Sequence, residues 1–310
     1  MIKNATILVT NKCNGRCMMC NIWNTKTSEK EMTVDEYRKL FSKSEFREIE
    51  DLNISGGEPT LRKDIIEIID VMSEYMPKVH MFFLSINGTN PEKVRDLFLQ
   101  YSKRIKDVYV CVSIEGDRET NKKVRGIDSY DSAVKTIKLC KEANPKIHSI
   151  ISMTLTPINS NKKSLEHIKR LAEETGSTYS FRKGWKNDTY YHNCANKKID
   201  INEKQKGDVV CFMERYCTQD PFMRAQIEYF KSDSMPLMKN CHAGDIFVLI
   251  RPDGSIYPCI NSSRKIGDLE RGIFVKKIND LGKYESCPCC TECCFYPMLN
   301  WSSYSTKKQY

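Results

Sequence analysis

Short apolar segments alternate with longer amphipathic segments through most of the chain. Segments rich in β-branched and aromatic residues predict strands at 5–10, 49–54, 79–86, 108–114, 148–155 and 177–181. Between them, apolar residues recur at helical spacing, which predicts helices beginning near residues 33, 61, 90, 129 and 164. Strands that alternate with such helices pair in parallel through right-handed crossovers. The pattern therefore predicts an α/β fold, either an open doubly wound sheet or a partial barrel.

Two of the predicted helices begin with recognisable capping sequences. Residues 33–36, Thr-Val-Asp-Glu, have the form of a capping box, and Asn90-Pro91 places proline at the first helical position. The cysteines and glycine-rich segments of this region lie where the predicted strands end. Ligands of parallel sheets gather at the carboxyl ends of the strands, so we expect the functional site there.

The pattern changes after residue 183. Residues 184–240 are polar and rich in aromatic residues, and we interpret them as a linker with bridging helices. Beyond them, two apolar segments flank Pro252-Asp253-Gly254, which predicts a β-hairpin. The predicted units are residues 1–183, 184–240 and 241–310, the last being a small cysteine-rich module built on the hairpin.

The overall composition indicates a folded, soluble protein, because hydrophobic residues make up 40% and charged residues 29% of the chain. The net charge of +9 comes from scattered lysines, which are typical of solvated helix faces, and no arginine-rich tract or RNA-binding motif points to nucleic acid. No apolar run reaches the roughly 18 residues of a membrane helix, and Met1 is not followed by a signal-peptide core. We therefore expect a cytoplasmic protein without a membrane partner.

The chain has 15 cysteines, which gather towards its two ends. In a reducing compartment they indicate metal binding rather than a disulfide framework. Cys13, Cys17 and Cys20 follow the first predicted strand, and three thiolates at this spacing can hold an iron–sulfur cube whose fourth iron has no protein ligand. A zinc site is the alternative, but zinc sites usually pair two C-x-x-C hooks, and no fourth ligand follows nearby.

This spacing resembles the C-x3-C-x2-C signature of the radical S-adenosylmethionine (SAM) superfamily. The resemblance implies a partial (β/α)6 barrel in which Cys13, Cys17 and Cys20 hold a 4Fe-4S cluster and SAM binds the open iron. Reductive cleavage of SAM would then give methionine and a 5′-deoxyadenosyl radical, as is natural in an anaerobic cell. Met19 departs from the signature, where an aromatic residue is common, although methionine can fill the same apolar contact.

Three further strand ends resemble SAM-binding motifs of this superfamily. Gly-Gly by itself would predict only a turn, but Gly56-Gly57-Glu58-Pro59 resembles the GGEP motif, whose glycines allow close approach and whose carboxylate receives the SAM amino group. Residues 85–89 resemble the T-N-G turn, with Ile86 replacing the usual threonine. The resemblance implies SAM contacts for Ser85, Asn87, Ser113 and Arg125, of which the arginine can bind a carboxylate bidentately.

The tail resembles the SPASM and twitch extensions of the superfamily, which open with C-x9-15-G-x4-C and continue with C-x-x-C. Cys241, Gly254 and Cys259 match the opening, followed by Gly267-Asp268-Leu269, a turn common in this extension. The preferred closing pair is Cys287 and Cys290, with Cys293 or Cys294 as alternatives. No cysteine follows Cys294, so we expect a truncated twitch-like module with one auxiliary 4Fe-4S cluster; a zinc ion on the same thiolates is the alternative.

The remaining cysteines of the linker, Cys194, Cys211 and Cys217, have no partner at ligand spacing, and we interpret them as buried or free thiols. The sequence does not identify a general acid or base. Five residues could each reach the mouth of a barrel: Glu115, Arg182, Tyr190, Tyr191 and His192.

The resemblance implies a radical SAM oxidoreductase or maturase that receives electrons from a reductant such as flavodoxin or ferredoxin. We expect oxidation or cross-linking of a peptide or protein side chain, because auxiliary clusters commonly accept an electron from the substrate radical. Barrel sequence begins close to Met1, so we expect any leader-binding function to come from a separate protein. A sugar or sugar nucleotide is the alternative substrate, which the net charge favours slightly. A non-catalytic iron–sulfur carrier or a zinc-binding protein is the alternative of another class, and GGEP argues against both.

Overall fold

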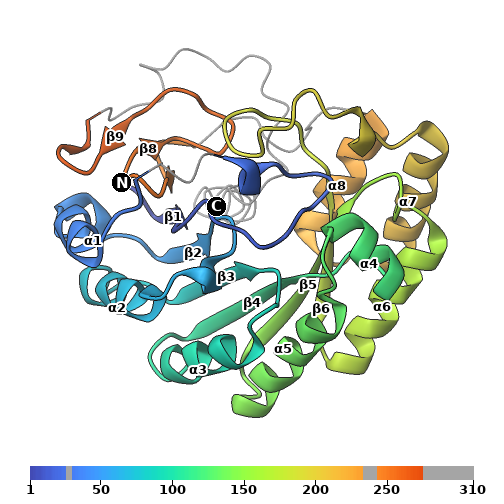
Figure 1. The fold of residues 1–310 in the computed structure, drawn as a ribbon, viewed down its shortest axis with the longest axis horizontal. Coiled ribbons are helices and arrows are strands. Elements are labelled where there is room, and N and C mark those ends of the chain that lie inside the picture. Colours follow the sequence, from blue (N-terminus) through green and yellow to red (C-terminus); the bar gives the residue numbers. More distant parts are fainter. Residues whose placement is uncertain (26–29, 233–242, 275–310) are drawn as a thin grey trace, which may run out of the picture.

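Six parallel strands alternate with helices in the first part of the structure, a computed structural model that describes residues 1–25, 30–232 and 243–274. The strands pair in chain order and are β1 (Asn4–Leu8), β2 (Asp51–Ser55), β3 (Met81–Ile86), β4 (Asp107–Ser113), β5 (His148–Leu155) and β6 (Thr178–Lys183). Around the outside of the curved sheet lie α1 (Val34–Phe41), α2 (Ile65–Tyr75), α3 (Pro91–Tyr101), α5 (Tyr130–Ala143) and α6 (Lys162–Thr175) (Figure 1). The predicted α/β fold is confirmed.

The strands have an apolar outer face and a partly polar inner face. Ile7, Ile54 and Leu84 are buried in the core that the strands form with the helices. Their neighbours Thr6, Asn53 and Ser85 line the interior of the barrel instead. Successive side chains of a strand point to opposite sides, so this alternation keeps one side of the curved sheet available for polar ligands.

The predicted hairpin is present and continues the barrel sheet. Strand β7 (Phe247–Ile250) pairs in parallel with β1, and β8 (Ile256–Tyr257) pairs antiparallel with β7. The sheet continues through β9 (Gly267–Asp268) and β10 (Gly272–Ile273). The module that the sequence suggested as a separate unit therefore begins with strands that belong to the same sheet as β1 (Figure 1).

The helix starts were predicted with one clear error. The capping box is confirmed, because the Thr33 amide donates to Glu36 and the Glu36 amide donates to Thr33 Oγ1. The helix expected near residue 61 begins only at Ile65, because a short 3-10 helix, η3 (Pro59–Leu61), comes first. No helix within the described residues is both long and apolar enough to cross a membrane.

Three helices surround the barrel after β4 and β6 without having been placed by the sequence. Helix α4 (Arg118–Arg125) precedes α5, and its ends are set by the N-cap Asp117 and by Gly126, which has φ +65°. Helices α7 (Glu203–Tyr216) and α8 (Pro221–Ser232) lie in the region interpreted as a linker with bridging helices, whose bounds the sequence did not give. They pack against α6 and β6, so this region belongs to the barrel wall.

Candidate functional site

The three cysteines of the signature face one cavity at the carboxyl ends of the strands. The cavity measures about 190 Å³, and its wall includes Cys13, Cys17 and Cys20. Of the residues expected to contact SAM, the wall also includes Gly56, Gly57, Ser85, Asn87, Ser113 and Arg125. Strand ends far apart in sequence thus meet where the sequence predicted a ligand, while Glu58 and Pro59 lie outside the lining.

Gly15 lies close to the first two thiols of the loop. A Cβ atom at this residue would lie 3.3 Å from Cys17 Sγ and 3.5 Å from Cys13 Sγ. Within the described residues, no three His, Cys, Asp or Glu side chains converge closely enough to hold a single metal ion. An iron–sulfur cube requires a different arrangement, because each thiolate binds its own iron. Its ligands are therefore spread around the cluster and do not converge on one metal ion. Three thiols around one cavity fit such a cluster.

The cysteine loop is docked on the end of helix α4. The Arg16 amide donates to the Arg125 carbonyl and the Met18 amide to the Val124 carbonyl, both at 2.9 Å. The last carbonyls of a helix lack partners inside the helix, so the loop satisfies them. Gly126 permits this contact, because a Cβ there would lie 2.4 Å from the Arg16 carbonyl oxygen.

The GGEP turn holds the loop from the side of β2. The Gly57 amide donates to the Thr10 carbonyl at 2.7 Å, and the Glu58 amide donates to the Lys12 carbonyl at 2.8 Å. A Cβ at Gly57 would lie 2.2 Å from the Lys12 carbonyl oxygen. The glycines therefore permit close approach to the segment before Cys13, in addition to facing the cavity.

The Glu58 carboxylate is buried and hydrogen-bonded by the protein. It accepts hydrogen bonds from the amide and hydroxyl of Thr60 at 3.2 and 2.6 Å, and from the Asn87 amide at 2.7 Å. Burial raises the pKa of Glu58, and these hydrogen bonds oppose the rise. In this structure the carboxylate connects two strand ends, and a direct contact with an ammonium group remains a prediction.

Arg125 is a buried cation beside the thiols. Its Nη1 lies 3.4 Å from Glu115 Oε1, while its buried Nε has no hydrogen-bond partner within the described residues. Burial opposes the charge of Arg125, but the negative charges of ionised Cys17 and then of Glu115 more than compensate and raise its pKa. An arginine side chain stays protonated in proteins in any case. A buried donor without a partner is costly, which favours an anionic ligand in the adjoining cavity.

The thiols themselves favour the neutral form when no metal is bound. Burial raises the pKa of Cys20 to about 12 and also raises the pKa of Cys13 and Cys17. Metal binding requires thiolates, so a bound cation must supply the energy of deprotonation. Met19 is buried and lines the same cavity, as expected for an apolar contact.

Sequence reasoning missed part of the cavity wall. Ser152 and Thr154 of β5, Cys111 of β4 and Ile260 of the hairpin region all line it. The alternation of polar and apolar residues in each strand was the signal that could have identified the polar members. Arg182, Tyr190 and Tyr191, considered as possible barrel-mouth residues, line the cavity as well, whereas Glu115 lies behind Arg125 outside the lining.

One cysteine of the predicted auxiliary site, Cys259, lies within the described residues. Cys259 is half-buried and packs against the apolar group of Leu8, Ile22 and Ile260, which Cys13 and Cys20 also contact. The other proposed auxiliary ligands, Cys241, Cys287, Cys290, Cys293 and Cys294, lie outside the described residues. Cys194 and Cys211 are exposed and Cys217 is buried, and none of the three forms a disulfide within the described residues; that they do not bind metal stays a prediction.

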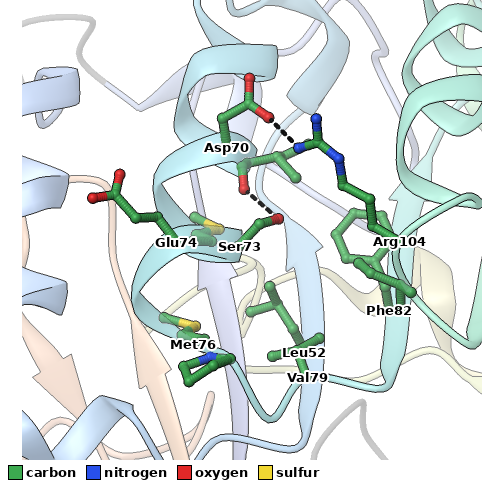
Figure 2. A pocket seen from close by; sticks show the side chains of 12 residues that line it. Leu52, Asp70, Ser73, Glu74, Met76, Val79, Phe82 and Arg104 are labelled. Atoms are coloured by element: carbon green, nitrogen blue, oxygen red, sulfur yellow. Dashed lines mark hydrogen bonds and ion pairs between the residues drawn. The ribbon is translucent and has the colours of Figure 1, made fainter.

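A larger cavity lies at the opposite ends of the strands, and no thiol lines it. It measures about 480 Å³ and is lined by Leu52, Val79, Met76 and other residues around the end of α2 (Figure 2). Its Asp70 is engaged by neighbours, accepting from Tyr101 Oη at 2.9 Å and Arg104 at 3.4 Å. No cysteine lines this cavity, so the smaller cavity near Cys13 is the stronger candidate.

Comparison with known proteins shows the family of the chain. A profile of the Radical SAM superfamily matches residues 7–173, which is more than half of the chain. The sporulation killing factor maturation protein SkfB of Bacillus subtilis is 24% identical over 283 residues, covering 90% of this chain and 64% of SkfB. The mycofactocin maturase MftC of Mycobacterium tuberculosis is 24% identical over 260 residues, covering 81% of this chain and 62% of MftC.

A solved structure shares the fold. Streptococcus suis SuiB bound to S-adenosylmethionine gives a TM-score of 0.63 at 17% identity, covering 86% of this chain and 63% of SuiB. At this identity the similarity concerns the fold, and it supports a partial barrel over an open doubly wound sheet. The chain spans less than two thirds of the length of each of these three proteins.

Proposed function

Because the chain belongs to the radical SAM superfamily, we propose that it cleaves SAM reductively to modify a peptide side chain. When bound, a 4Fe-4S cluster with SAM on its open iron supplies a 5′-deoxyadenosyl radical that abstracts hydrogen from a substrate. The observation that carries the proposal is the convergence of three thiols and the buried Arg125 on one cavity. The thiols match the ligands of the cluster, and the guanidinium matches the carboxylate of SAM.

Each cavity residue has a defined task in this proposal. Cys13, Cys17 and Cys20 hold three irons, and Arg125 binds the SAM carboxylate with its unpartnered Nε and a second nitrogen. Gly56 and Gly57 leave space beside the cluster for the amino group, and Ser113 contacts the ribose or carboxylate. Ser85 and Asn87 provide polar contacts from β3, with the Asn87 side chain fixed by a 2.6 Å hydrogen bond to Asn14 Oδ1.

The proposed substrate is a peptide, because SkfB and MftC are named as maturation proteins and SuiB, which shares the fold, has been solved bound to a precursor peptide. In an oxidation or cross-link, the substrate loses one hydrogen atom to the 5′-deoxyadenosyl radical. It then loses one electron to an acceptor and one proton to solvent, so two hydrogen atoms leave for each SAM consumed. An auxiliary 4Fe-4S cluster would supply such an acceptor; Cys259 would hold it with one thiolate, and its other predicted ligands lie outside the described residues.

The first electron comes from a reduced flavodoxin or ferredoxin, because cleavage of SAM consumes one electron for each turnover. Lys12 is exposed just before the cysteine loop. Acidic electron carriers are attracted by positive charge near the site of transfer, an effect that salt screens. Replacement of Lys12 by glutamine should reduce the rate with flavodoxin but leave the rate with dithionite unchanged.

Anaerobic reconstitution tests the proposal directly. The chain is loaded with iron and sulfide and reduced with dithionite in the presence of SAM, and 5′-deoxyadenosine is measured by mass spectrometry. The parent should produce it, and Cys17→Ala should not. Equal yields from the two proteins, or no yield from a fully loaded parent, would refute the function. About eight irons per chain would support two cubes, whereas about four would remove the auxiliary cluster from the proposal.

The substrate class needs a separate comparison. Precursor peptides encoded beside the gene and a panel of sugar nucleotides are each incubated with the active enzyme and SAM. A peptide product lighter by two hydrogen atoms, formed only with SAM, would support the proposal. Modification of a sugar nucleotide and of no peptide would replace it with the alternative substrate class.

A further inference from the structure

Residues 187–196, here called the asparagine strap, form a closed loop that depends on two buried asparagines. The Asn187 Oδ1 accepts from the amides of Tyr190 and Tyr191 at 2.9 and 2.8 Å. The Asn187 amide in turn donates to Asn193 Oδ1 at 2.9 Å, and the Asn193 amide donates back to the Asn187 carbonyl. Asn187 is 8% exposed and Asn193 is 2% exposed. The strap is therefore fixed by its own polar side chains.

One side of the strap holds the end of the cysteine loop that contains Cys20. Asn193 Nδ2 donates to the Met19 carbonyl and Asn196 Nδ2 donates to the Met18 carbonyl, both at 2.6 Å. The amide of Asn21 donates to the Tyr191 carbonyl at 2.8 Å. Cys20 thus lies between two positions that are fixed by the strap.

The strap also reaches the GGEP turn. The Tyr190 hydroxyl donates to the Gly56 carbonyl at 2.6 Å, and Tyr190 itself lines the cavity. Met19, whose carbonyl is held by Asn193, lines the same cavity. The strap therefore contacts the backbone of two separate wall segments.

The other side of the strap is anchored on the hairpin region. Asn187 Nδ2 donates to Asn261 Oδ1 at 2.7 Å, and Thr189 Oγ1 donates to the Ile260 carbonyl at 2.6 Å. Arg251 Nη2 donates to the Thr189 carbonyl at 2.8 Å. These contacts lie next to Cys259, so the strap connects the cysteine loop to the segment that carries an auxiliary thiol.

We propose that Asn193 is a positioning residue for SAM binding, acting through the Met19 carbonyl and the neighbouring Cys20. This inference rests on the proposed function. Its side chain is the centre of the strap, because it accepts from Asn187 and donates to the carbonyls of both Met19 and Trp185, the latter at 2.8 Å. The strap thereby fixes the third thiol and an apolar wall residue in one orientation, with the hairpin region as its anchor.

Removal of the Asn193 side chain should weaken SAM binding without removing the metal ligands. Residues that orient metal ligands typically contribute about 10–100-fold to affinity or activity. For Asn193→Ala we expect the SAM concentration that gives half of the SAM-dependent change in the EPR spectrum of the reduced cluster to rise about 10-fold. The KM for SAM should rise similarly, while the iron content stays at the parent level.

Asn161→Ala is the matched control. Asn161 also uses both ends of its carboxamide, because its Oδ1 accepts from the Ser164 amide and its Nδ2 donates to the Ile158 carbonyl, both at 3.0 Å. It caps α6 and lies outside the cavity lining. A general loss of stability would affect both variants, whereas loss of positioning should affect only Asn193→Ala.

The outcomes separate this inference from the function on which it rests. A parent without a SAM-dependent EPR change would refute the proposed function. A parent with that change, and an iron-loaded Asn193→Ala with parental SAM affinity, would refute the positioning role alone. Loss of iron from a folded Asn193→Ala would also refute the role as stated, because the strap would then support cluster loading rather than SAM binding to a loaded cluster. If Asn193→Ala does not fold, Asn193→Asp gives the same decision, because it keeps an acceptor for the Asn187 amide and removes the donor to the Met19 carbonyl. Weaker SAM binding then supports the role, and parental binding refutes it.

Discussion

Gly126 and Gly176 offer a controlled measurement of how much helix α4 contributes to the cysteine loop. Each glycine follows a helix, α4 and α6 respectively, and each has a left-handed backbone, with φ of 65° and 61°. A Cβ at Gly176 would have nothing within 4 Å, whereas one at Gly126 would lie 2.4 Å from the Arg16 carbonyl oxygen. Alanine at both positions therefore has the same backbone cost, and only Gly126→Ala disturbs the loop.

The backbone cost of a left-handed alanine is about 1–2 kcal/mol, and this is all that Gly176→Ala should lose in unfolding free energy. Gly126→Ala should also lose the two hydrogen bonds from Arg16 and Met18 to the end of α4. At about 0.5–1.5 kcal/mol each, they add about 1–3 kcal/mol. The urea midpoint should consequently fall further for Gly126→Ala than for Gly176→Ala.

Iron content distinguishes loss of stability from loss of the site. After anaerobic reconstitution, Gly176→Ala should bind as much iron as the parent, because its substitution lies away from the loop. Gly126→Ala should bind less iron and produce less 5′-deoxyadenosine, because Arg16 lies between two of the cysteines. Equal urea midpoints and equal iron contents for the two variants would show that docking on α4 does not position the thiols.

Two further predictions concern single charged groups. Arg125→Lys keeps a positive charge but loses the bidentate fork, so the KM for SAM in 5′-deoxyadenosine formation should rise about 10-fold, and an unchanged KM would contradict the role of Arg125. Burial raises the pKa of Asp51 to about 6. The folded state therefore holds this proton more tightly than the unfolded chain, and stability is lost as the pH rises from about 4 to 6. In urea unfolding, Asp51→Asn should raise the unfolding free energy by about 1–3 kcal/mol at pH 8 and change it little at pH 4. Equal effects at both pH values would contradict the claim that burial destabilises the ionised form of Asp51.

The barrel and the positions of its motifs were predictable because their signals are local. Strands appear as short apolar segments, and GGEP or Cys13-x3-Cys17 follows a strand directly in the sequence. Parallel pairing then requires the strand ends to meet at one edge, which places Gly57, Asn87 and Ser113 together. No contact between these residues had to be known beforehand.

The support of the cysteine loop was not predictable, because it depends on contacts without a periodic signal. Helix α4 has Val124 as its single apolar side chain, so hydrophobic spacing could not reveal it, and Asp117 and Gly126 were its only markers. Asn193 acts through hydrogen bonds to a segment 174 residues earlier. The pairing of β7 with β1 also joins segments that are far apart in the sequence. No local sequence signal near residue 247 identifies β1 as the partner strand.

The thiols are held in place mainly by the surrounding fold rather than by the loop itself. Within the loop, the hydrogen bonds of the described backbone amides are those from Cys20 to the Cys17 carbonyl and from Gly15 to Cys13 Sγ. Most other fixed points come from outside: the GGEP turn, the end of α4 and the asparagine strap. A loop held from three sides loses little conformational entropy when it binds a cluster, because that entropy was already lost when the barrel folded. Substitutions at these three supports should therefore impair cluster loading or SAM binding even though none of them removes a ligand.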